Sequence, residues 1–430
     1  MQTKPRVLVI AEAANPEWVS VPLIGWLHSE ALRAVADVHV VTQARNRAAF
    51  LKAGRVEGED FTAIDTEWLE APAVGVANKL RGDAGKGWTT LQTFQSMTYP
   101  YFERLVWRKF KDQLRAGAFD IVHRITPMSP TSHSTIARKC AKIDVPFVLG
   151  PINGGLPWPK GFGAERRRER EYMSYIRSAH RLAPGYRRML DAASAIIVGS
   201  SATASEIPSN LTQKTIQISE SAVDIDRFSL SPKEGLSTPL RACFVGRMVP
   251  YKGPDILLRA AAPLLREGRL HIDLIGDGPL MPTLNEIIAS EGIAEAVTLH
   301  GWVPHENLQS TAIASDIFAF PSVREFGGTS ILEMMAIGLV PVIVDYGGPG
   351  DNIPPDLGFK LPLSTRDQLI TDLRATLTGI ADDPAQLLAL REKGQRWIHQ
   401  TFTWPRRAEQ INDIYQWVLG NRDSKPAPFG

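Results

Sequence analysis

The stretch “DIFAFPSVREFGGTSILEMMAIGLVPVIVDY”, Asp316–Tyr346, contains the pattern that decides the fold. Its two ends, “DIFAFPS” and “VPVIVDY”, are apolar runs rich in β-branched and aromatic residues, which is typical of strands buried on both faces. Between these runs a helix is expected to begin near Ile331. A strand, a helix and a second strand in this order predict a parallel sheet.

The same alternation of strand and helix runs through the rest of the chain. Buried strands are expected at “RVLVIAE”, “DVHVVTQ”, “FDIVHRI”, “VPFVLG” and “SAIIVGS”, and again at “LRACFVG”, “LHIDLIGDG” and “AVTLHG”. Ser229–Pro239, rich in Ser, Pro and Gly, reads as a linker between the two sets. We therefore expect an α/β protein with two doubly wound, Rossmann-like domains, residues 1–228 and 236–403, facing each other across a cleft. An amphipathic helix at 404–420 is expected to return to the first domain.

The composition limits the classes of protein that fit. Of the 430 residues, 44% are hydrophobic and 22% are charged, as in globular proteins of two or three domains. A net charge of +2 gives no global basic field, so nucleic acid is not expected as a partner. Cys140 and Cys243 indicate reduced thiols, and no secretory or membrane-spanning segment is evident, so we expect a cytoplasmic protein.

The segment that joins the two quoted strands, “EFGGTSILE” (Glu325–Glu333), allows two interpretations. Ser330 and Glu333 form the S-x-x-E capping-box pattern at the start of a helix. Alternatively, the two carboxylates flank glycine main chain that a phosphate can approach closely, and each carboxylate can accept hydrogen bonds from a vicinal diol. The second interpretation predicts a nucleotide sugar, which has diols at both ends and phosphates between them.

A second stretch supports a phosphate site. “FVGRMVPYKG”, Phe244–Gly253, places Arg247 and Lys252 in a loop after a buried strand and before a helix, where two cations suit a diphosphate. The alternative is two solvated surface cations. The turn “LIGDGP” lacks the third glycine of a dinucleotide fingerprint, because Met281 stands there, and it indicates only a tight turn.

In combination, these motifs resemble a known family. Pro321–Asp351 closely resembles the donor site of retaining glycosyltransferases of family four (glycosyl transferases group 1), which have the GT-B fold. The shared features are Glu, seven residues, Glu, followed by “AIGLVPVI” and a Gly-Gly turn. “GRMVPYKG”, “GDGP”, “GWVPHENL” and “FTWPRRAEQINDIY” extend the resemblance over almost all of residues 236–420. The chain departs from the family's usual Gly-Phe-Gly at Phe326-Gly327-Gly328.

The resemblance implies roles for the residues of the second domain. Glu333 would hold the ribose hydroxyls of the nucleotide, and Glu325 would contact the donor sugar beside the reacting centre. The diphosphate contacts would come from Arg247, Lys252, Gly327, Gly328 and Thr329. These groups would stabilise the leaving diphosphate without a metal or another cofactor.

In the first domain, the resemblance implies that His123, at the end of “FDIVH”, faces the transferred sugar. Taken alone, His123 is better explained as a buried histidine with satisfied hydrogen bonds. Asn153 and Gly154, after the strand “VPFVLG”, could bring backbone close to the sugar or acceptor, and the alternative is an ordinary loop.

The expected function is a retaining, metal-independent glycosyltransferase of the hexosyltransferase type. It would move a sugar from a nucleotide-sugar donor to a glycan or lipid-linked acceptor, in the biosynthesis of a surface polysaccharide or glycolipid. The alternatives are a sugar-nucleotide epimerase or phosphorylase of the same architecture, or a non-catalytic protein that binds nucleotide sugars.

Two basic runs, Trp107–Arg115 and Arg166–Arg170, bear on the location of the protein. Basic amphipathic surface can hold a protein on anionic lipid at the inner face of the plasma membrane. For either run alone, a solvated helix face with paired charges is the simpler explanation.

Overall fold

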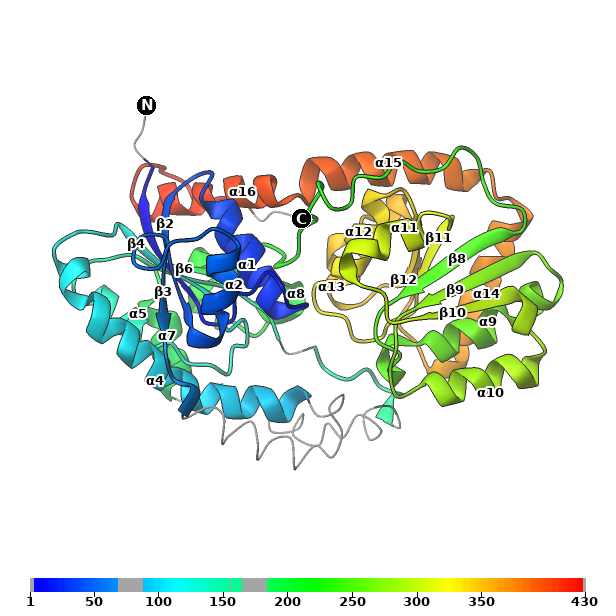
Figure 1. Cartoon of the computed structure of the whole chain (residues 1–430), viewed down its shortest axis with the longest axis horizontal. Coiled ribbons are helices and arrows are strands. Elements are labelled where there is room, and N and C mark those ends of the chain that lie inside the picture. Colours follow the sequence, from blue (N-terminus) through cyan, green and yellow to red (C-terminus); the bar gives the residue numbers. More distant parts are fainter. Residues whose placement is uncertain (1–3, 69–87, 155, 164, 166–183, 428–430) are drawn as a thin grey trace. The chain divides into compact units, whose positions relative to one another are not determined.

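The computed structural model describes residues 4–68, 88–154, 156–163, 165 and 184–427 (Figure 1). The chain divides into two compact units. The first unit comprises the described residues within Met1–Gly155, Arg170–Glu220 and Trp404–Gly430, and the second those within Leu156–Glu169 and Ser221–Thr403. Each unit is built on one parallel sheet, as the alternating pattern predicts.

The first unit contains a seven-stranded parallel sheet in the order β3-β2-β1-β4-β5-β6-β7. Its strands are β1 (Arg6–Ala11), β2 (Asp37–Gln43), β3 (Phe61–Ile64), β4 (Ile121–Thr126), β5 (Phe147–Ile152), β6 (Ala195–Val198) and β7 (Thr215–Gln217). In β1, Leu8 and Ile10 join one buried cluster while Val7 and Val9 join another. Because neighbouring side chains point to opposite faces of a strand, both faces of this sheet are buried.

Helices cover both faces of the first sheet. They are α1 (Val21–Leu32), α2 (Arg47–Lys52), α4 (Trp88–Arg115), α5 (Ile136–Ala141), α7 (Pro184–Ala192), α8 (Ser201–Ala204) and α16 (Trp404–Val418). Helix α16 packs against α1 (Figure 1), and its Ile411, Ile414 and Tyr415 are buried in the cluster that contains Val7 and Val9. Helix α16 thus belongs to the first unit, although it follows the second unit along the chain.

The second unit contains a six-stranded parallel sheet in the order β10-β9-β8-β11-β12-β13. Its strands are β8 (Leu240–Val245), β9 (Leu270–Ile275), β10 (Val297–Gly301), β11 (Ile317–Phe320), β12 (Val340–Val344) and β13 (Phe359–Leu361). The order reverses between β8 and β11, because β9 follows β8 on one side and β12 follows β11 on the other. Ligands of such sheets bind at the carboxyl ends of the strands at this reversal.

The helices of the second unit also lie on both faces of its sheet. They are α9 (Pro254–Arg266), α10 (Met281–Glu291), α11 (Leu308–Ala312), α12 (Thr329–Ala336), α13 (Gly347–Asn352), α14 (Arg366–Asp382) and α15 (Gln386–Thr401). Helix α9 packs against α10 and α14, and α12 packs against α15 (Figure 1). Within the described ranges, no helix of either unit combines the length and apolar character needed to cross a bilayer.

One segment from the first half of the chain belongs to the second unit. Phe162 is fully buried in the core of that unit, and Arg324 Nε donates a hydrogen bond to the Leu156 carbonyl (3.3 Å). Tyr346 Oη donates another to the Pro157 carbonyl (2.9 Å). The alternation of strands and helices predicted this segment in the first domain, and its packing in the second corrects that prediction. The side chain of Phe162 finds its apolar partners in the second core.

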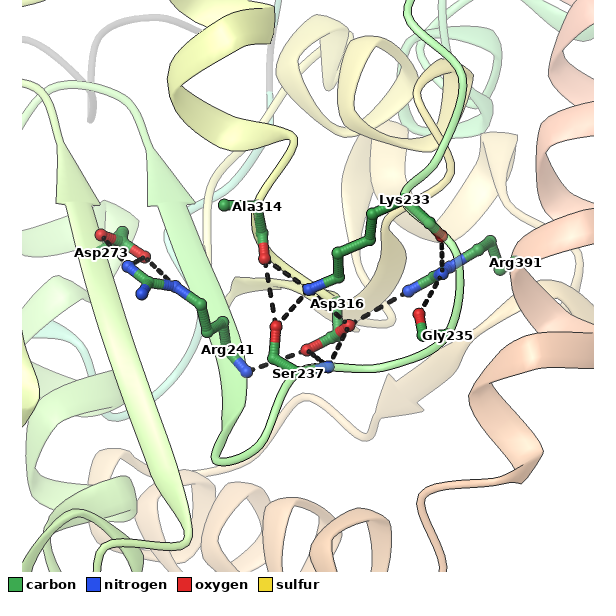
Figure 2. Close-up of polar contacts among 8 residues, drawn as sticks. All are labelled: Lys233, Gly235, Ser237, Arg241, Asp273, Ala314, Asp316 and Arg391. Carbon is green, nitrogen blue, oxygen red and sulfur yellow. Dashed lines mark hydrogen bonds and ion pairs between the residues drawn. The ribbon is translucent and has the colours of Figure 1, made fainter.

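The stretch expected to be a linker, Ser229–Pro239, is held to the second unit by a buried carboxylate (Figure 2). Asp316 is fully buried and forms an ion pair with Lys233 Nζ (2.9 Å). It also accepts hydrogen bonds from Arg391 Nη2 (3.1 Å) and the main-chain N–H of Arg241 (3.0 Å). Arg391 also donates to the carbonyls of Lys233 (3.1 Å) and Gly235 (2.9 Å). A buried charge with several partners fixes its surroundings, so this stretch is part of the second unit.

Candidate functional site

The loop between β11 and α12 sets the start of the helix. Gly328 is the N-cap residue with φ = 69°, a left-handed conformation that glycine adopts without a Cβ clash, and α12 begins at Thr329. The Thr329 and Ser221 hydroxyls lie 2.7 Å apart. The capping-box prediction for Ser330 and Glu333 is wrong. Because the N-cap is Gly328, Glu333 lies in the second turn, and the helix has no side-chain cap.

Main-chain contacts brace this loop. The Glu325 carbonyl accepts from the Gly348 N–H (3.1 Å), and the Gly327 carbonyl accepts from Asn352 Nδ2 (3.0 Å). A Cβ on Gly348 would lie 1.8 Å from the Phe326 carbonyl oxygen, so only glycine allows this approach. The first turn of α13 therefore fixes the main chain around Phe326-Gly327-Gly328. Asn352, which follows the Gly-Gly turn, has no motif in the sequence that points to this contact.

Lys252 and Glu325, predicted separately from two motifs, form an ion pair. Lys252 ends the short turn that follows β8, and its Nζ lies 3.0 Å from Glu325 Oε2. The side chains are 16% and 18% exposed, and Lys252 Nζ also lies 5.1 Å from the centre of the Phe320 ring. Burial alone would lower the pKa of Lys252, but the Glu325 carboxylate outweighs it, so the pKa is raised and the ammonium stays charged.

Arg247 lies in the same loop as Lys252. It is exposed, two residues after the end of β8, in a turn where the Val249 N–H donates to the Arg247 carbonyl (2.9 Å). Because β8 and β11 are neighbours in the sheet, both cations and the start of α12 follow the carboxyl ends of adjacent strands. The structure thus brings Lys252 to Glu325 and places Arg247 on the same edge of the sheet.

Glu333 has a partner that sequence reasoning missed. Its Oε1 lies 2.8 Å from Nε2 of His305, which follows β10. The Glu333 side chain is 9% exposed and that of His305 is 25% exposed. The segment “GWVPHENL” contributed to the family resemblance, but nothing in its spacing singled out His305.

In the first unit, His123 is fully buried in β4. Its Nδ1 lies 2.7 Å from Tyr415 Oη, and its Nε2 lies 2.7 Å from the Gly150 carbonyl oxygen. Burial lowers the pKa of His123 to about 4, although the Gly150 carbonyl opposes the shift, so the ring is neutral near pH 7. Both nitrogens have partners within the unit. This geometry favours the structural alternative for His123 over contact with a sugar.

The other first-domain candidates lie just after β5. Asn153 is buried, donates from Nδ2 to Glu220 Oε1, and has its N–H bonded to the Met128 carbonyl (2.8 Å). Gly154, at φ = 147°, follows it directly. These contacts give the Asn153 side chain a role inside the unit. The basic run 166–170 lies outside the described residues, and among the described residues no cluster of three or more His, Cys, Asp or Glu could hold a metal ion.

Two parallel sheets, each covered by helices on both faces, are the architecture of the GT-B fold. Residues 226–397 match the model of the family described as Glycosyl transferases group 1.

Named relatives are similar to part of the chain, and a solved structure is similar in fold. The 2-deoxystreptamine glucosyltransferase of Streptomyces kanamyceticus is 29% identical over 220 residues, which are 48% of this chain and 56% of that relative. A GDP-mannose-dependent phosphatidylinositol monomannoside mannosyltransferase of Mycolicibacterium smegmatis is 28% identical over 225 residues, again 48% and 56%. The matches thus span about half the length of these relatives. The crystal structure of Anabaena HepE with UDP has a TM-score of 0.63 at 15% identity, covering 96% of this chain and all of HepE, and shows the same fold.

Proposed function

We propose that this protein is a retaining, metal-independent glycosyltransferase that uses a nucleotide-sugar donor. The observation that carries the proposal is the constellation around α12: Glu325 paired with Lys252, Gly328 at the helix start, and Glu333 held from the side by His305. The N-terminus of α12 lies between the two carboxylates in sequence, and Lys252 pairs with the first of them. This order matches the sugar, the diphosphate and the ribose of a nucleoside diphosphate sugar.

The chemistry requires stabilisation of a leaving diphosphate. As the bond between the anomeric carbon and the phosphate oxygen breaks, negative charge develops on that oxygen and positive charge on the sugar. The negative charge on the phosphate oxygen would be stabilised by Lys252, Arg247 and the main-chain N–H groups at the start of α12. The Glu325 carboxylate would accept hydrogen bonds from hydroxyls of the donor sugar. Retention would follow from attack on the face that the diphosphate leaves, with the leaving oxygen accepting the acceptor's proton.

Binding of the diphosphate is the first test. The protein is screened by thermal shift with UDP, GDP, ADP and TDP and with their common sugar conjugates, because a ligand that binds the folded state raises the melting temperature. The expected result is stabilisation by one base series, lost in the variant Glu333→Ala. If no nucleotide stabilises the protein at millimolar concentration, the donor assignment is wrong.

Turnover is the second test. Hydrolysis or transfer of the sugar is followed with the donor selected by the screen, in the presence and absence of EDTA. Metal independence predicts activity within about twofold under both conditions, whereas a metal clamp on the diphosphate supplies several kcal/mol. Anomeric configuration of the product is read by NMR, and inversion would contradict the retaining mechanism.

For the acceptor, we propose a glycan or lipid-linked carrier of surface polysaccharide or glycolipid synthesis. The M. smegmatis relative is named for a phosphatidylinositol mannoside acceptor, and another, from Erwinia amylovora, for amylovoran biosynthesis. In the first unit, α4 and α5 present a basic face, and Lys139 Nζ lies 5.3 Å from the centre of the Trp107 ring between them. The exposed cations are Arg104, Arg108 and Arg115 on one side of α4, with Arg138 on α5 and Lys142 directly after it.

Such a face suits the surface of an anionic bilayer, since each basic residue near it contributes about 1 kcal/mol. Binding there would put the reaction at the inner face of the plasma membrane, in line with the expected cytoplasmic location. In flotation at low salt, the wild-type protein is expected to float with phosphatidylglycerol vesicles. The double variant Arg104→Glu, Arg108→Glu is expected to stay unbound. The matched control is Arg47→Glu, Lys52→Glu on α2. Equal loss in both variants, or binding to phosphatidylcholine alone, would contradict a specific basic face.

A further inference from the structure

His305 links Glu333 to an arginine from a distant part of the chain. Nη1 of Arg227 lies 2.7 Å from His305 Nδ1, and His305 Nε2 lies 2.8 Å from Glu333 Oε1. Arg227 precedes Phe228, a fully buried residue whose ring centre lies 5.4 Å from that of His305 in an edge-to-face arrangement. The imidazole of His305 therefore has a hydrogen-bond partner at each nitrogen and packs against the Phe228 ring.

The segment that supplies Arg227 is itself fixed. The main-chain N–H groups of Ser229 and Leu230 both donate to Gln309 Oε1, at 3.1 and 3.2 Å. Gln309 belongs to α11, which directly follows the turn that contains His305. Arg227 and His305 thus reach one another from two segments that are already tied together.

The partners decide which nitrogen of His305 carries the proton. Arginine has only N–H donors, so His305 Nδ1 must accept the hydrogen bond from Arg227. The proton of the neutral ring then lies on Nε2, which donates to the Glu333 carboxylate. A carboxylate has about four acceptor positions, and this bond uses one of them on Oε1. Among the described residues, no hydrogen bond or ion pair involves Glu333 Oε2, so that oxygen keeps its acceptor positions.

We propose that His305 is a positioning residue that fixes Glu333 for the ribose diol of the donor. The inference rests on the proposed function, because it assigns the diol to Glu333. By holding Oε1, the Arg227–His305 pair orients the carboxylate in one rotamer, with Oε2 and the remaining positions of Oε1 presented to two hydroxyls. Preorganisation of this kind raises the affinity for a diol and leaves contacts to the diphosphate unchanged.

The test compares a nucleotide that has the diol with one that lacks it. The probes are the diphosphate that binds best among UDP, GDP and ADP, and its 2′,3′-dideoxy counterpart, both measured by calorimetry. The wild-type protein is expected to prefer the ribonucleotide by tenfold or more, since hydrogen bonds to a charged group are the strong ones. In His305→Phe, this preference is expected to fall at least about fivefold, through weaker ribonucleotide binding, with the dideoxy affinity unchanged.

Two further variants separate positioning from general loss of structure. His300→Phe removes another histidine–carboxylate contact of the second unit, 2.8 Å to Asp273 Oδ1, and is expected to keep the ribose preference. His305→Gln offers an amide N–H for Glu333 and a carbonyl oxygen for Arg227, and is expected to restore most of the preference. In turnover, His305→Phe should raise the donor KM and change kcat by less than about twofold, as loss of uniform binding does.

The outcomes distinguish the inference from the proposed function. A wild-type protein that binds no nucleotide, or binds both probes alike, contradicts the ribose assignment of Glu333 and with it the proposed function. A wild-type protein that prefers the ribonucleotide, with an equal preference in His305→Phe, overturns the role of His305 alone. An equal loss of affinity for both nucleotides in His305→Phe also overturns the role of His305, since a purely structural effect does not depend on the diol.

Discussion

The ion pair between Lys252 and Glu325 leads to opposite predictions for its two members. Lys252→Met removes a cation that would contact the diphosphate, while Glu325→Gln removes a carboxylate that competes with the diphosphate for that cation. For a nucleoside diphosphate without a sugar, we expect the first variant to bind more weakly and the second to bind equally or more tightly. For the intact nucleotide sugar, both variants should bind more weakly, because Glu325 would then contact the sugar.

The magnitudes follow from the burial of the pair. A charge-assisted hydrogen bond to phosphate contributes about 1.5–3 kcal/mol, which predicts about 10- to 150-fold weaker diphosphate binding in Lys252→Met. Both side chains keep a sixth or so of their surface exposed, 16% and 18%, so the free energy of unfolding should fall by about 1–2 kcal/mol, less than for a fully buried pair. Glu325→Gln should change diphosphate binding by no more than about fivefold, toward tighter binding.

The assay is calorimetric titration of both variants with the diphosphate and with the nucleotide sugar. The wild-type affinity for diphosphate should also stay constant from about pH 7.5 to 9, because the raised pKa of Lys252 keeps its ammonium protonated and the terminal phosphate, with a pKa of about 6, is fully ionised there. If the two variants reduce the affinity for the diphosphate equally, the ion pair is a structural contact, and the assignment of Lys252 to the diphosphate is refuted.

Three further predictions concern stability and the first unit. Asp316→Asn removes the charge that compensates Arg391 and Lys233 (Figure 2), and should lower the unfolding free energy of the second unit by about 3 kcal/mol. Urea denaturation with hydrogen exchange measures this change. A loss under about 1 kcal/mol would contradict a stabilising role for the network. His123 has its pKa lowered in the folded state, so the unfolded chain binds more protons between pH 6.5 and about 4, and stability should fall as pH falls through that window by up to about 1.4 kcal/mol per pH unit. His123→Gln should reduce the slope of stability against pH and leave kcat unchanged. A hundredfold fall in kcat with intact folding would instead indicate that His123 contacts the transferred sugar.

The local patterns of the sequence were sufficient for ten of the strands, but not for the short edge strands β3, β7 and β13. They also placed the residues proposed for the donor at one edge of the second sheet. Strands such as β11 and β12 are continuous apolar runs, and both acids of “EFGGTSILE” carry polar partners at the expected edge. The start of α12 was misplaced because a left-handed glycine, Gly328, sets the boundary ahead of the Ser-x-x-Glu pattern.

Partners that are distant in the sequence could not be predicted. His123 meets Tyr415 across 292 positions, and Arg227 meets His305 across 78, and in neither case does spacing point from one residue to the other. The segment around Phe162 was assigned by its neighbours along the chain, whereas its unit is decided by which core accepts the ring. Such choices depend on the packed tertiary structure and are invisible to periodicity.

The return of α16 to the first unit has a consequence for synthesis on the ribosome. Strands β1–β7 are translated before β8, yet their core stays incomplete until Ile411, Ile414 and Tyr415 emerge. All described residues of the second unit have been translated by then. The unit that is translated first is therefore completed last. A premature stop codon before α16 would leave the core of the first unit incomplete and accessible to chaperones and proteases, although the second unit could already fold.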